Sequence, residues 1–98
     1  MALIAFDIDG TLIEQWEFEP GKFEDVPRPE VTDILWLLHK KGHDIIVWSG
    51  GGKEYAERWG RKLSLPQDVT YMMKVASPDI DIAIDDQDVK LAKVNLKV

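Results

Sequence analysis

The sequence has no cysteine, which excludes a disulfide scaffold, a zinc site built from thiolates and a cysteine nucleophile, and which fits a reducing compartment. Any bound metal must therefore be held by oxygen or histidine ligands. Basic residues are also few: 12 Lys and Arg stand against 18 Asp and Glu, for a formal net charge of −6. This balance disfavours nonspecific binding to nucleic acid and suits a divalent cation.

Long apolar runs are absent as well. The apolar start at 2–6 has no basic segment before it and meets Asp7 and Asp9 almost at once, so we expect neither a signal peptide nor a membrane span. The cytoplasm is the expected location. A length of 98 residues predicts a single domain over 1–98. Four tryptophans are many for so small a core, so one or two are expected at a ligand cleft or an oligomer contact. The sequence leaves the oligomeric state open, a homo-oligomer included.

Strand and helix patterns alternate along the chain. Short apolar runs predict buried strands at 2–6, 44–48, 69–73 and 79–84. Helical spacing predicts one helix that begins near Pro29 and stops at Gly42, and a second over 53–63. This alternation is typical of an α/β domain, here a single Rossmann-like, three-layer domain with a short parallel sheet and helices on both of its faces.

Two segments do not fit this alternation. Residues 12–28 mix acidic and aromatic side chains around Pro20-Gly21, which predicts a hairpin or flap after the first strand. Its aromatic residues are expected to pack within that flap, or in one case to stack on a substrate: Trp16, Phe18 and Phe23. The tail over 89–98 fits either a short helix or a helix that turns into an edge strand, and the sequence does not decide between them.

Acidic residues follow the first and the last of the predicted strands. Asp7 and Asp9 are two residues apart at the end of the first strand, and Asp85 and Asp86 end the fourth. If these strands are neighbours, three or four carboxylates converge on one spot, because the carboxyl ends of parallel strands share an edge. Carboxylates so close repel one another unless a cation joins them, so the pattern indicates a site for Mg²⁺.

Two further polar residues end the other strands. Ser49 ends the second strand and Lys74 ends the third, which adds a hydroxyl and an ammonium group to the same rim of the sheet. Together with the acidic residues, they can bind and polarise a phosphoryl group. His39 and His43 lie at a helix end, where histidine commonly contacts the last carbonyl groups, and we leave them out of the site.

Four segments then fall into a recognisable order: LIAFDIDGT (3–11), IIVWSG (45–50), Lys74 within YMMKVASP, and DIAIDD (81–86). In that order they resemble the motifs of the haloacid dehalogenase-like phosphatase superfamily, and the chain looks most similar to its small members that lack a cap domain. Those members have Lys and Pro adjacent in the third motif. Here Lys74 precedes Pro78 by four residues, so Lys53, just after the second motif, is a weaker rival for the lysine's role.

The resemblance implies a function and a catalytic pair. It implies a Mg²⁺-dependent phosphatase that acts on a phosphorylated small molecule or on the terminal phosphate of a larger one. Asp7 would attack phosphorus and become an aspartyl-phosphate, and Asp9 would protonate the leaving oxygen and then activate the hydrolytic water. Ser49 would bind a phosphoryl oxygen, and Lys74 would offset the charge that develops near Asp7.

The resemblance also implies metal ligands and phosphate contacts. Mg²⁺ would be held by Asp7, by the backbone carbonyl of Asp9 and by the acidic pair, with Asp86 the direct ligand and Asp85 acting through water. The implied phosphate contacts come from the two glycine-containing loops: Gly10, Thr11 and Gly50. With only the 12–28 flap and no cap domain, the site is expected to be open.

Other functions compete with this interpretation. A module on the same fold that binds Mg²⁺ or accepts a phosphoryl group with little or no turnover, much as response-regulator receiver domains do, is the main alternative. Receiver domains, however, carry their acid pair and phosphoacceptor on strands that do not match the pattern here. Dehalogenase chemistry would leave Asp9 and the Asp85-Asp86 pair without a purpose. A purely structural protein would tolerate replacement of Asp7 and Asp86.

Overall fold

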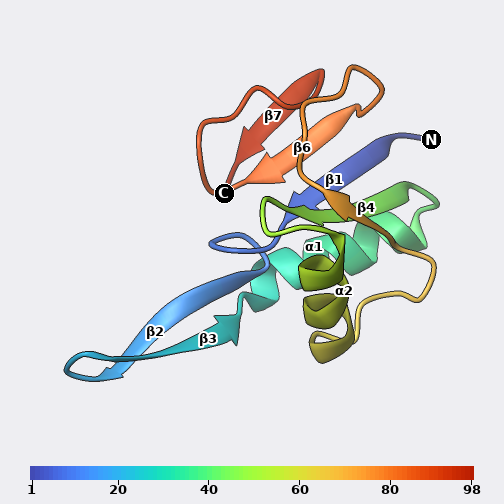
Figure 1. The fold of residues 1–98 in the computed structure, drawn as a ribbon. Helices are drawn as coiled ribbons and strands as arrows, with labels where there is room; N and C mark the ends of the chain where they lie inside the picture. The colour runs from blue at the N-terminus through green and yellow to red at the C-terminus, as the bar shows by residue number, and fades with distance from the viewer.

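The computed structural model describes residues 1–98, and its strands and helices are arranged around one parallel sheet (Figure 1). In chain order the elements are β1 (Leu3–Asp7), β2 (Ile13–Glu19), β3 (Lys22–Pro27), α1 (Pro29–Lys40), β4 (Asp44–Ser49), α2 (Lys53–Lys62), β5 (Thr70–Met73), β6 (Ile82–Asp85) and β7 (Val94–Lys97). The sheet has the order β5-β4-β1-β6-β7, and all its strands are parallel. The predicted α/β class with a parallel sheet is confirmed.

The first strand occupies the centre of the sheet because its side chains are apolar on both faces. Ile4, Ala5 and Phe6 are each at most 2% exposed. β4 pairs with one side of β1 and β6 with the other, so that Asp7 lies beside Trp48 and Phe6 beside Ile84. The strand order therefore reverses at β1, because the strands that follow it in the chain are added first on one side and later on the other. The carboxyl end of β1 is thus a topological switch point of the kind where α/β proteins bind ligands.

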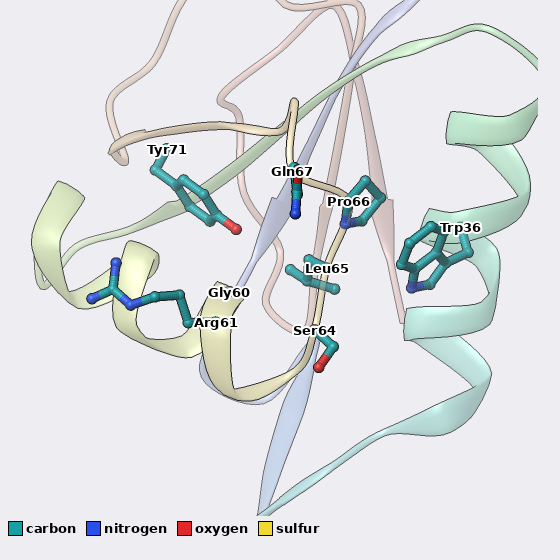
Figure 2. Close-up of a pocket in the computed structure, with 8 residues that line it drawn as sticks. All are labelled: Trp36, Gly60, Arg61, Ser64, Leu65, Pro66, Gln67 and Tyr71. Atoms are coloured by element: carbon teal, nitrogen blue, oxygen red, sulfur yellow. The ribbon is translucent and has the colours of Figure 1, made fainter.

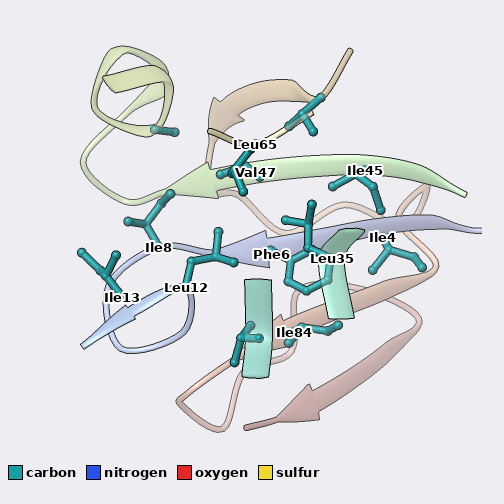
Figure 3. Close-up of a cluster of buried hydrophobic side chains, with 13 residues drawn as sticks. Ile4, Phe6, Ile8, Leu12, Ile13, Leu35, Ile45, Val47, Leu65 and Ile84 are labelled. Atoms are coloured by element: carbon teal, nitrogen blue, oxygen red, sulfur yellow. The ribbon is translucent and has the colours of Figure 1, made fainter. Parts of the chain in front are cut away.

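Both helices cover the same face of the sheet. Figure 3 shows the larger core cluster, in which Leu35 of α1 packs with Phe6 and Val47 of the sheet. Ala56 of α2 belongs to the same cluster, so the expectation of helices on both faces is wrong. The reason is the strand order: the crossovers β1-α1-β4 and β4-α2-β5 run in one direction across the sheet, and right-handed crossovers in one direction put their helices on one face.

Loops cover the second face. Its core is a smaller cluster in which Trp48 and Ala5 pack with Ile80 from the loop between β5 and β6. Leu91, from the loop between β6 and β7, packs against this cluster. The connections that cross on this side contain no helix, which leaves the sheet with one helical layer and one layer of loops.

The segment after β1 forms an antiparallel hairpin, β2-β3, that extends away from the sheet (Figure 1). It is anchored at its base, where Ile13 is 1% exposed and the Arg28 N–H donates to the Leu12 carbonyl (2.9 Å). The predicted packing of aromatic residues within the flap is wrong, since more than half of each of these side chains is exposed: Trp16, Phe18 and Phe23. A two-stranded hairpin has no second layer to cover them.

The tail contains a strand and no helix. β7 lies parallel to β6 at the edge of the sheet. The Asn95 side chain accepts hydrogen bonds from the Leu91 and Ala92 N–H groups (2.9 and 3.1 Å), so these groups are satisfied without a helical turn. The fourth predicted strand is also shorter than expected and begins at Ile82, because a turn at Ser77 accepts the Ile80 N–H and places Ile80 in the core. Neither helix is long and apolar enough to span a membrane.

Candidate active site

The ends of neighbouring strands bring polar side chains to one edge of the sheet. Asp7 ends β1, Ser49 ends β4 and Asp85 ends β6, and none of the three is more than 4% exposed. Lys74 directly follows β5, and its backbone N–H donates to the Ser49 carbonyl (2.9 Å), which holds it beside β4. The structure therefore places these four residues, each predicted from its position after an apolar strand, at the switch point of the sheet.

Three carboxylates converge at this edge. Oxygen atoms of Asp7, Asp85 and Asp86 all lie within 4.8 Å of one another. Burial raises the pKa of Asp7 to about 6; the Lys74 hydrogen bond opposes the rise, and the charge of Asp85 adds to it. Such crowding is relieved by a cation, and three carboxylate oxygens are ligands that fit Mg²⁺.

A lysine side chain lies between two of these carboxylates. The Lys74 ammonium donates to Asp7 Oδ1 (3.0 Å) and to Asp85 Oδ2 (3.1 Å). Burial alone would lower the pKa of Lys74, but its hydrogen bonds to Asp7 and Asp85 outweigh burial and raise it. Lys53, by contrast, is exposed and pairs with Glu57 at 3.8 Å on the surface of α2. The structure thus brings Lys74 to the carboxylates and leaves Lys53 away from them.

A tight turn follows β1 and holds the acidic pair close to it. Gly10 has φ +80°, and a Cβ added there would collide with the Asp86 carboxylate. Both the backbone conformation and the lack of space therefore require glycine at this position. The buried Thr11 hydroxyl lies 3.3 Å from both Asp7 Oδ2 and Asp86 Oδ1. The Thr11 N–H is engaged within the turn, where it donates to the Ile8 carbonyl (3.1 Å), so Thr11 contacts the carboxylates through its hydroxyl.

Asp86 is held from its other side as well. Partial burial favours the neutral carboxyl, but hydrogen bonds outweigh it and lower the pKa of Asp86, the strongest coming from the Gln87 side chain (3.0 Å). Asp85 accepts the Gln87 backbone N–H (3.0 Å). The acidic pair is therefore fixed in place by hydrogen bonds before any metal binds.

The loop between β4 and α2 is built from glycine. The Ser49 hydroxyl accepts the Gly51 N–H (3.0 Å), and Gly52 has φ +103°, which an L side chain rarely adopts. Gly50 is exposed, and no heavy atom lies within 4 Å of where its Cβ would be. The loop therefore leaves open space at Gly50, where a phosphoryl group could approach the backbone.

Two residues at the site were not predicted from the sequence. The Tyr55 hydroxyl donates to Asp9 Oδ1 (2.6 Å), and the Arg28 guanidinium donates to the Gly10 carbonyl (2.7 Å). Burial, and to a lesser degree the contact with Asp9, raise the pKa of Tyr55 to about 12, so its hydroxyl stays protonated. The sequence offered one signal for each: Tyr55 lies in the first turn of a helix that follows a glycine loop, and Arg28 ends the hairpin.

The largest hollow of the molecule does not lie at the cluster of carboxylates. It has a volume of about 570 Å³ and is found between α1 and the end of α2, with Trp36 on one side and Arg61 and Tyr71 on the other (Figure 2). A smaller hollow of about 230 Å³ lies beside Asp9, at the base of the hairpin, with Glu14 and Asp25 in its wall. The candidate site thus has a hollow on its Asp9 side.

Comparison of the chain with models of protein families, with curated proteins and with solved structures finds no match.

Proposed function

We propose that the chain is a Mg²⁺-dependent phosphatase that forms an aspartyl-phosphate on Asp7, on a capless, Rossmann-like domain of the haloacid dehalogenase type with β2-β3 as its flap. One observation carries the proposal. Asp7 lies at the end of the central strand, hydrogen-bonded to Lys74 and Thr11, and oxygen atoms of Asp85 and Asp86 lie within 4.8 Å of an oxygen of Asp7. A nucleophile, an anchored cation and a metal-binding acid pair are the groups that phosphoryl transfer needs.

The residues present fit a magnesium ion. Asp7 and Asp86 would hold it directly, together with the backbone carbonyl of Asp9, while Asp85 would act through a water molecule. Asp9 itself is not part of the carboxylate cluster, which leaves its side chain for proton transfer. Mg²⁺ bound there would neutralise the charge that otherwise keeps Asp7 from a phosphate dianion.

In the first step, a carboxylate oxygen of Asp7 forms a bond to phosphorus. The bond between phosphorus and the substrate's bridging oxygen breaks with its electron pair, and that oxygen takes the proton of the Asp9 carboxylic acid. Lys74 compensates the negative charge on the transferring group, as its contact with Asp7 Oδ1 (3.0 Å) allows, and the Ser49 loop binds a phosphoryl oxygen.

In the second step, water hydrolyses the aspartyl-phosphate. Asp9, now a carboxylate, takes a proton from the water, whose oxygen bonds to phosphorus. The bond between phosphorus and Asp7 breaks and returns its electron pair to the Asp7 carboxylate. Inorganic phosphate leaves, and both aspartates are then back in their starting states, Asp7 as a carboxylate and Asp9 as a carboxylic acid.

The test is hydrolysis of 4-nitrophenyl phosphate with and without Mg²⁺ by the wild-type chain, by Asp7→Asn and by Asp33→Asn. Asp33 is an exposed residue of α1, so Asp33→Asn changes the charge equally but leaves the site intact. We expect Mg²⁺-dependent turnover that Asp7→Asn abolishes and Asp33→Asn retains. Activity that survives Asp7→Asn would overturn the proposal, and a long-lived phosphorylated wild-type chain with little turnover would assign a switch in its place.

A further inference from the structure

The side chain of Asp9 has one hydrogen-bond partner. Asp9 is exposed, and its carboxylate bonds only to the Tyr55 hydroxyl, at 2.6 Å from Oδ1. Asp7, in contrast, is held by both Lys74 and Thr11. An exposed aspartate with a free side chain samples several rotamers, so the orientation of Asp9 depends on Tyr55.

Tyr55 is itself firmly placed. Its ring is partly buried against the larger core cluster, and it lies close to the backbone of Gly51, where an added Cβ would come within 3.3 Å of the ring. The Arg58 guanidinium also lies near it, 5.9 Å from the ring centre. The packing of the ring therefore holds the Tyr55 hydroxyl beside Asp9.

We propose that Tyr55 is the positioning residue for the general acid, a role that rests on the proposed phosphatase function. With Oδ1 engaged by the Tyr55 hydroxyl, Oδ2 is the oxygen that carries the proton to the substrate. As that proton moves to the bridging oxygen and the bond to phosphorus breaks, Asp9 becomes a carboxylate. The Tyr55 hydrogen bond then becomes charge-assisted, so it strengthens as the transition state forms.

The proposal predicts an effect that depends on the leaving group. An alkyl phosphate needs a proton on its leaving oxygen, whereas 4-nitrophenolate leaves as a stable anion. In Tyr55→Phe we therefore expect kcat/KM to fall about 10- to 100-fold for glycerol phosphate, against less than about threefold for 4-nitrophenyl phosphate. The ratio kcat/KM isolates this effect, because it reports formation of the aspartyl-phosphate and excludes its hydrolysis.

Tyr71→Phe is the matched control. It removes the same hydroxyl from the other tyrosine in the chain, whose ring packs against Gly60 near the far end of α2. This variant should keep the wild-type ratio between the two substrates. A uniform loss for both substrates in Tyr55→Phe, or an equal change in Tyr71→Phe, would show a structural role and overturn the proposal.

A double-mutant cycle with Asp9→Asn completes the experiment. If Tyr55 acts only through Asp9, then Asp9→Asn should show the same selectivity against the alkyl phosphate, and adding Tyr55→Phe to it should change kcat/KM little further. Additive losses would overturn the positioning role. A wild-type chain that hydrolyses neither substrate would overturn the phosphatase function and this role with it, whereas an active chain with an unchanged ratio in Tyr55→Phe would overturn this role alone.

Discussion

Lys74 places an ammonium group between two buried carboxylates, and its position after β5 decides which lysine serves the site. We expect Lys74→Ala to lower kcat/KM for 4-nitrophenyl phosphate by about 100-fold or more, because the charge on the transferring group loses its compensation. Lys53→Ala should change it by less than about twofold, since Lys53 forms a surface ion pair with Glu57. The measurement is steady-state hydrolysis by both variants at saturating Mg²⁺.

The reverse pattern, with Lys53→Ala the more damaging, would contradict this assignment. Lys74→Arg separates charge from geometry. It keeps a cation but cannot reproduce the two contacts of about 3 Å from one nitrogen, so we expect only partial recovery of activity.

Residues at strand ends were predictable, and residues that meet across loops were not. Each of three site residues follows an apolar run: Asp7, Ser49 and Asp85. Such a run predicts a buried strand, and a polar residue at its end is predicted to lie at the carboxyl edge of the parallel sheet. Tyr55 and Arg28 reach the site only because the turn after β1 bends toward α2 and the hairpin base. No periodicity in the sequence encodes that meeting.

At the level of elements, the β2-β3 hairpin is an appendage with its own contacts. Its two strands make their extensive contacts with each other, and only its base is tied to the core, through Ile13 and the Arg28 N–H. We therefore expect a variant in which residues 15–25 are replaced by Asn-Gly to fold cooperatively. Asn-Gly closes a two-residue hairpin between the paired residues Glu14 and Val26.

In that variant the midpoint of thermal unfolding should change by less than about 8 °C, which corresponds to about 1 kcal/mol in a domain of this size. Circular dichroism melts give this value. Hydrolysis of 4-nitrophenyl phosphate should persist, because none of the residues proposed for chemistry lies in the deleted segment. Loss of cooperative unfolding would show that the hairpin helps to hold the sheet together.

The helices were predictable as elements, but the face that they cover was not. The spacing of Val31 and Leu35 indicates a helix with one apolar side. Which face of the sheet receives that side depends on the strand order, and the order is set by pairing between segments distant in the sequence. The tail shows the same limit, since the side chain of Asn95 replaces the hydrogen bonds of a helical turn.

On the scale of the whole molecule, the burial of Asp7 makes the free energy of unfolding depend on pH. The pKa of Asp7 is raised to about 6 in the folded chain, so folding favours its protonated form. This contribution to stability is fully present below the pKa of the unfolded state and is lost as the pH rises through about 6. Without divalent ions, Asp7→Asn should therefore gain about 2 kcal/mol relative to the wild type between pH 4 and pH 8.

Urea unfolding of both chains in EDTA at pH 4 and pH 8 measures this difference. The proposed binding of Mg²⁺ to the folded cluster predicts that the ion reverses this difference at pH 8, because it would then stabilise the wild type more than the variant. If the difference in the free energy of unfolding between the wild type and Asp7→Asn is the same at both pH values, folding does not raise the pKa of Asp7, and the prediction is wrong.

The central position of β1 also bears on how the site comes into being. Thr11 and Asp86, which meet at the acid cluster, are 75 residues apart in the chain. During synthesis, β1, α1 and β4 can assemble as soon as they emerge, but β6 must still be made before it can dock on the free side of β1. Until then the Asp7 carboxylate faces an unpaired strand edge and has neither Asp85 nor Asp86 beside it. The cluster of three carboxylates thus forms last, and a nascent chain without β6 lacks two of the three carboxylates that we propose as metal ligands.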